Sequence, residues 1–156
     1  MPTPDDRLHR YARLAVQVGL NLQPGQILGV NALVEHAPLA RAIAQEAYTA
    51  GARYVDVSYS DQHVRRAHIA SAPDDQLGFS PPWLVERYDE LGRVGGALIA
   101  ISGNPEPELY ADLDGERVGK VRMREVAEAS LRLTDGLVNW AIVAYPNEGW
   151  ATTVFG

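Results

Sequence analysis

The sequence predicts an α/β fold: a mainly parallel open sheet of about four strands with helices on both faces. Short apolar segments typical of strands alternate with longer segments in which apolar residues recur at helical spacing. Prolines and glycines separate these segments, as they do at turns. Because parallel strands need long crossover connections, this alternation indicates a parallel sheet covered by its own helices.

The first predicted helix covers residues 6–18, and Gly19 stands where a left-handed cap would end it. Its apolar face is formed by Leu8, Tyr11, Ala15 and Val18. A turn rich in proline and glycine follows at residues 21–25, and residues 26–31 are predicted to form the first strand.

The second predicted helix covers residues 38–50, with Pro38 in its first turn and Gly51 just after its end. Residues 53–60 then alternate between apolar and polar side chains, which is typical of a strand with one wetter face. We therefore expect this second strand to lie near an edge of the sheet.

The central part of the chain continues the pattern. Ser60 and Asp61 are suited to cap a helix that runs through Ile69, and the prolines at 81–82 introduce another that extends to Gly92. Residues 97–101 are predicted to form a buried third strand. Residues 105–133 are expected to be mostly helical.

The fourth predicted strand, residues 137–144, is so apolar that we expect it in the interior of the sheet with both faces covered. After a turn at Pro146, a helix is expected to open with Trp150, Val154 and Phe155. About two turns of helix would not complete the cover of this strand, so we expect the backbone amides of these residues to be poorly protected from exchange with solvent. We also expect the chain to be the front part of a longer protein.

Composition limits the functional classes. A chain of 156 residues suits a single domain, and its formal net charge of -6 disfavours nucleic acid as a partner. No apolar run approaches the roughly 20 residues that span a bilayer, so no membrane partner is expected. The chain has no cysteine and its first residues do not resemble a secretory signal, so a cytoplasmic location is expected.

Polar residues follow each predicted strand, at the edge of a parallel sheet where ligands bind. A set drawn from Glu35, His36, Asp61, His63 and Glu148 offers the carboxylate and imidazole groups that hold divalent metals. Helix capping alone accounts for Ser60, Asp61 and Asn104, which stand at helix starts. We favour this structural interpretation, and we assign no catalytic, cofactor-binding or metal-binding residue within 1–156.

Other site classes find little support. The segment after the first strand, residues 31–38, has no glycine and cannot form the phosphate-binding turn of a nucleotide site. Residues 115–120 are similar to a P-loop but one residue short, with Val121 in place of the needed Ser or Thr, which we interpret as chance. No serine lies in the Gly-x-Ser-x-Gly pattern of an acyl-transfer site.

Taken in order, four segments resemble the start of the thermophilic-type metallo-aminopeptidases, the aminopeptidase T, S and II family. They are residues 11–26 (YARLAVQVGLNLQPGQ), the helix end at 47–52 (AYTAGA), residues 101–105 (ISGNP), and residues 140–146 (WAIVAYP) leading to Gly149, Trp150 and Ala151. Any one segment is weak, but four in the same order over nearly the whole chain are specific.

The resemblance implies a cytoplasmic, dimeric enzyme that removes N-terminal amino acids from peptides with a pair of divalent metals, zinc or cobalt. In that family the metal ligands lie in a C-terminal catalytic domain, so no ligand or catalytic residue is carried over to this chain. Residues 1–156 match the N-terminal α/β domain, which packs beside the catalytic domain and borders its cleft.

Two hypotheses follow. The favoured one is the N-terminal domain of a metal-dependent aminopeptidase, a hydrolase and metalloprotease active in proteolysis, with this piece inert and binding no metal by itself. The alternative is a free-standing small-ligand-binding or interaction module that kept the fold without the enzyme. A reading frame that continues past Phe155 into a domain bearing Glu and His residues would select the first.

Overall fold

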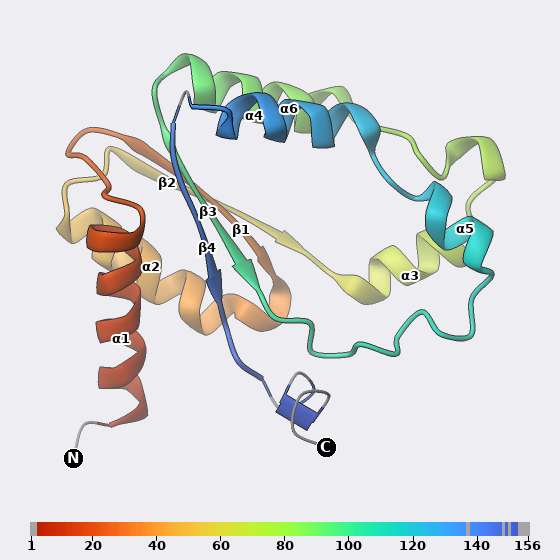
Figure 1. Cartoon of the computed structure of the whole chain (residues 1–156), viewed down its shortest axis with the longest axis horizontal. Helices are drawn as coiled ribbons and strands as arrows, with labels where there is room; N and C mark the ends of the chain where they lie inside the picture. Colours follow the sequence, from red (N-terminus) through yellow and green to blue (C-terminus); the bar gives the residue numbers. More distant parts are fainter. Residues whose placement is uncertain (1–2, 137, 148, 150, 153–156) are drawn as a thin grey trace.

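The computed structural model describes residues 3–136, 138–147, 149 and 151–152, and it contains a four-stranded parallel sheet (Figure 1). Strands β1 (Ile27–Leu33), β2 (Tyr54–Ser60), β3 (Ala97–Ser102) and β4 (Asn139–Ala144) lie in the order β2-β1-β3-β4. Gly29 is in register with Asp56 on one side and Leu98 on the other. The predicted fold class and its four strands are confirmed.

One face of the sheet is covered by α1 (Pro4–Leu14), the π-helical segment η1 (Ala15–Gly19) and α2 (Ala37–Thr49) (Figure 1). A capping box starts α1: the Thr3 hydroxyl accepts from the backbone N–H of Asp6, and the Asp6 carboxylate accepts from that of Thr3. The main core lies here, and its fully buried side chains include Val16, Leu28, Val30, Leu39, Ile43 and Ile99. Each such side chain stabilises the fold by about 1.5–3 kcal/mol.

The opposite face carries α4 (Pro82–Arg93) and α6 (Arg124–Thr134), which lie side by side (Figure 1). They cover the beginnings of the strands through a small cluster of Leu91, Leu98 and Leu133. Gly29 permits this approach, because a Cβ at that position would lie 2.9 Å from Leu91 Cδ2. Within the described residues, no helix lies directly over the later halves of β1 and β2 on this face, where a hollow is found (Figure 1).

The remaining helices lie beyond the end of β2. They are α3 (Gln62–Ser71), the 3₁₀ turn η3 (Asp74–Gln76) and α5 (Gly115–Lys120), while a further 3₁₀ turn, η2 (Val34–His36), joins β1 to α2. As predicted, Asp61 caps α3, Gly51 ends α2 with a φ of 93°, and β2 is an edge strand. None of the helices in the described part of the chain is long and apolar enough to cross a membrane.

The end of the first helix differs from the prediction. The chain makes a π-helical turn in which the Leu20 N–H donates to the carbonyl of Ala15, and this wider turn leaves Val18 exposed while Val16 and Leu20 are buried. The left-handed position also moves: it is Asn21, with a φ of 53°, and not Gly19. Asparagine tolerates this conformation better than most residues do.

Two further predictions need correction. The range predicted to be mostly helical, residues 105–133, is helical in α5 and α6, but its first part, residues 105–114, forms successive turns. Strand β4 was expected in the interior, but within the described residues it pairs only with β3, and Trp140 and Ile142 are 49% and 65% exposed. An apolar sequence indicates that a strand can be covered, but not its place in the sheet order. Leu137, Glu148, Trp150, Val154 and Phe155 lie outside the described residues.

A buried carboxylate joins α1 to α2 and makes stability depend on pH. The Glu46 side chain is only 7% exposed and accepts from Arg13 Nε at 3.0 Å. This hydrogen bond from the guanidinium holds the pKa of the Glu46 carboxyl below its usual value, against the opposing effect of burial.

We expect Glu46→Gln to lower the melting temperature by several degrees at neutral pH, because the amide loses the charge-assisted pairing with Arg13. A carboxyl whose pKa is lower in the folded state stabilises the fold above its unfolded pKa, about 4.3, and this contribution is lost as pH falls through the folded pKa. The difference from the parent chain should therefore shrink in acid. Thermal melts from neutral to acid pH test this prediction, with the exposed Glu90→Gln as control. A difference in melting temperature between Glu46→Gln and the parent chain that is independent of pH would contradict it.

Candidate functional site

The candidate site lies at the carboxyl ends of the strands, where β1 leads to β2 on one side and β3 lies on the other. In open parallel sheets this reversal creates a crevice that binds ligands. Here His36, which follows β1, is fully buried between the loops after β1 and β3. The Leu33 N–H donates to His36 Nδ1 (3.2 Å), so the hydrogen-bond network assigns the ring proton to Nε2, which donates to the Gly103 carbonyl (2.8 Å).

The loop after β3 is shaped to receive this contact. Gly103 has a φ of 129°, and a Cβ at this position would collide with the Tyr145 carbonyl. The Asn147 amide donates to the carbonyls of both Gly103 (3.2 Å) and Tyr145 (3.4 Å), and the Tyr145 ring meets the His36 ring edge-on at 5.8 Å. His36 thus joins two loops across the crevice, and both of its ring nitrogens are already occupied.

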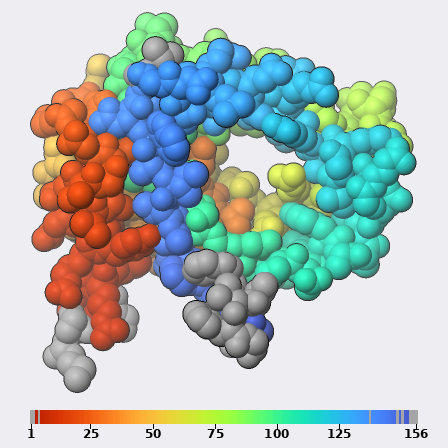
Figure 2. All heavy atoms as spheres, viewed as in Figure 1, coloured from red at the N-terminus to blue at the C-terminus, as the bar shows by residue number. Residues whose placement is uncertain are grey.

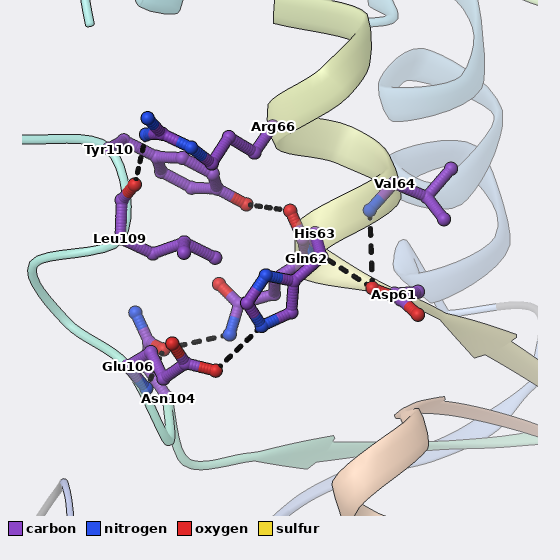
Figure 3. Close-up of polar contacts among 9 residues, drawn as sticks. All are labelled: Asp61, Gln62, His63, Val64, Arg66, Asn104, Glu106, Leu109 and Tyr110. Atoms are coloured by element: carbon purple, nitrogen blue, oxygen red, sulfur yellow. Dashed lines mark hydrogen bonds and ion pairs between the residues drawn. The ribbon is translucent and has the colours of Figure 1, made fainter. Parts of the chain in front are cut away.

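Two other predicted candidates, Asp61 and His63, lie at the start of α3 (Figure 3). Asp61 Oδ1 accepts from the backbone N–H groups of His63 (2.8 Å) and Val64 (3.2 Å), which confirms the interpretation that it caps a helix. His63 Nε2 lies 2.8 Å from Glu106 Oε1, with the two side chains 58% and 48% exposed. A pair this exposed contributes little to stability.

The 103–114 segment is held against α3 by further contacts (Figure 3). Arg66 donates to both carboxylate oxygens of Asp112, at 2.7 and 2.6 Å, and to the Leu109 carbonyl. These bonds from Arg66 hold the pKa of Asp112 below its usual value. The Tyr110 hydroxyl donates to the Gln62 carbonyl, and burial raises the pKa of its phenol. Sequence reasoning missed Glu106 and Asp112 because their partners lie more than 40 positions away.

The described residues do not fit a metal pair. His36 and Asp61 are committed to backbone groups, His63 is paired with Glu106, and Glu148 lies outside the described residues. Glu35 follows β1 with its Oε2 atom buried and without a hydrogen-bond partner. In the part of the chain that the structure describes, no three His, Asp or Glu side chains are grouped so that they could hold a metal ion. Residues 115–120, which are similar to a P-loop, form helix α5.

Comparisons with known proteins agree on one family. A family model described as "Thermophilic metalloprotease (M29)" matches residues 4–156. Aminopeptidase T of Thermus thermophilus is 37% identical over 151 residues, which are 95% of this chain and 37% of that protein. Aminopeptidase 2 of Geobacillus stearothermophilus is 34% identical over 156 residues, 97% of this chain and 37% of that protein.

A solved structure gives the same result. Wild-type AmpT from Thermus thermophilus superposes with a TM-score of 0.87 at 36% identity, covering 95% of this chain and 38% of that one. The chain therefore spans a little over a third of the length of the relatives that it matches.

Proposed function

Because the chain belongs to the thermophilic metalloprotease (M29) family, we propose that it is the N-terminal domain of a metal-dependent aminopeptidase, a hydrolase that removes N-terminal residues from peptides. The observation that carries this proposal is the match itself: almost the whole chain aligns with proteins named aminopeptidases, yet it covers only 37% of their length. The predicted assignment to this family is confirmed, and the activity of the whole protein is our proposal.

The catalytic metals, zinc or cobalt, belong in this proposal to a C-terminal catalytic domain. The arrangement of the described residues supports that placement, because His36, Asp61 and His63 each have a structural partner. Residues 1–156 then serve as a scaffold that packs beside the catalytic domain. The exposed Trp140 and Ile142 on β4 offer apolar surface for such a contact. The enzyme is proposed to act as a homodimer in the cytoplasm.

Residues 1–156 alone are expected to bind neither zinc nor cobalt stoichiometrically at micromolar metal. The physical reason is that a metal would have to break the bonds that His36 makes across the crevice or separate His63 from Glu106. Equilibrium dialysis or isothermal titration calorimetry measures this directly.

The control is a set of single alanine substitutions at Glu35, His36, Asp61, His63 and Glu148, which should leave any weak background binding unchanged. Saturable binding of one or two ions that disappears in these variants would show that the metal site lies within this chain. It would overturn the proposal that the catalytic metals bind in a C-terminal domain.

A further inference from the structure

A hollow of about 910 Å³ lies between the uncovered halves of β1 and β2 and the helices α3, α4 and α6. Figure 2 shows the molecule opened between α6 and the 103–114 segment. A hollow of this volume is in the size range of small-molecule sites, roughly 300–1,000 Å³. It lies on the opposite face of the sheet from the main core, and neither His36 nor the His63–Glu106 pair lines it.

The wall of the hollow carries hydrogen-bond donors that are fixed before any ligand arrives. Arg87 donates from Nε to Asp56 (2.6 Å), from Nη1 to Asn31 Oδ1 (3.0 Å) and from Nη2 to the Asp56 carbonyl. A guanidinium has five N–H groups, so two of those on Arg87 have no acceptor among the described residues. The Asn31 amide in turn donates to the Tyr88 hydroxyl (2.8 Å), whose own proton has no acceptor among the described residues. Arg87 and Tyr88 both line the hollow.

The charge of the hollow is opposite to that of the chain. Its lining includes Arg65 and Arg122, together with Arg87, whose charge is offset by its ion pair with Asp56, and one carboxylate, Asp61, whose Oδ1 caps α3. The whole chain, by contrast, has a formal net charge of -6. Among the described residues, no carboxylate lies within ion-pair distance of Arg65 or Arg122. Nearby arginines that face elsewhere are paired: Arg66 with Asp112 and Arg117 with Asp74. A concave site with this excess of positive charge attracts anions.

We propose that this hollow binds a small organic carboxylate with an apolar body, such as a short peptide through its C-terminal carboxylate. Arginine pairs with carboxylates in two-pronged geometry, and the remaining N–H groups of Arg87 with the Tyr88 hydroxyl supply that contact. The apolar lining, which includes Leu84, Val126 and Ala127, favours an organic body over an inorganic anion. The proposal stands independently of the aminopeptidase assignment.

Titration of the 156-residue chain with N-acetyl-alanyl-leucine and with its C-terminal amide tests the proposal, using calorimetry and NMR. We expect saturable binding of the acid, at least about tenfold weaker binding of the amide, and chemical-shift changes at Asn31 and Tyr88. Tyr88→Phe should weaken binding several-fold, and the double variant Arg65→Gln with Arg122→Gln about tenfold. Arg124→Gln, an exposed arginine that does not line the hollow, should bind like the parent chain.

Unchanged melting temperatures of the variants will establish that they remain folded. Equal binding of acid and amide, absence of saturable binding, or tighter binding of inorganic phosphate than of the acid would each overturn the proposal. None of these outcomes depends on whether a longer form of the protein hydrolyses peptides.

Discussion

Replacing Gly103 with alanine is expected to lower the free energy of unfolding by about 3 kcal/mol. Gly103 has a φ of 129°, a conformation that side chains rarely adopt, and a Cβ there would collide with the Tyr145 carbonyl. Either the loop after β3 or the chain after β4 must then move, which also disturbs the contact between Gly103 and His36. Urea denaturation of the parent chain and the variant measures the loss.

Gly115→Ala is the matched control for this prediction. Gly115 lies in α5 without a positive φ, and no atom lies within 4 Å of the position its Cβ would take. Alanine there should leave stability unchanged or raise it by up to about 1 kcal/mol, because alanine is the better helix former. Similar losses in the two variants would contradict the special conformation assigned to Gly103.

Replacing His36 with alanine is also expected to cost about 3 kcal/mol. The ring is fully buried, so its removal leaves a cavity. The Leu33 N–H, which donates to His36 Nδ1, would be left without its acceptor. Among the described residues, the Gly103 carbonyl would keep only its hydrogen bond from the Asn147 amide. The loops after β1 and β3 would lose their direct connection. Chemical denaturation reports the stability, and amide hydrogen exchange reports the local opening.

His63→Ala separates this structural role from a general effect of losing a histidine. His63 was an equal candidate in the sequence, but its side chain is 58% exposed, and the one polar contact of its ring among the described residues is with Glu106. Its replacement should change stability by less than about 1 kcal/mol. If the two alanine variants lost the same stability, His36 would not be the connection across the crevice that its contacts indicate.

Local patterns predicted most of the fold. The strand segments, the Asp61 cap and the end of α2 before Gly51 depend on residues near one another in the sequence, and all were identified correctly. The errors arise where the structure is determined by contacts between residues that are distant in the sequence. The π-helical turn that exposes Val18 follows from how Val16 and Leu20 are buried in the core, and the edge position of β4 follows from the order of the strands.

The candidate site was predictable in its location but not in its contacts. The polar residues expected after the first two strands do lie at the carboxyl end of the sheet, after β1 and β2, where open parallel sheets bind ligands. That His36 would be fully buried, and that His63 would meet Glu106, depend on loops 43 or more positions apart. The arginine-lined hollow was missed for the same reason, because Arg65, Arg87 and Arg122 come from three separate segments without a shared motif.

The measurement that tests the account most directly is hydrolysis of leucine p-nitroanilide by two polypeptides, residues 1–156 alone and the same chain extended through the downstream coding sequence. We predict no release of amino acid by residues 1–156, with or without added zinc or cobalt. The extended protein should hydrolyse the substrate and lose this activity to a chelator, because the metal ligands are proposed to lie in the added domain. Chelator-sensitive hydrolysis by residues 1–156 alone would contradict the account.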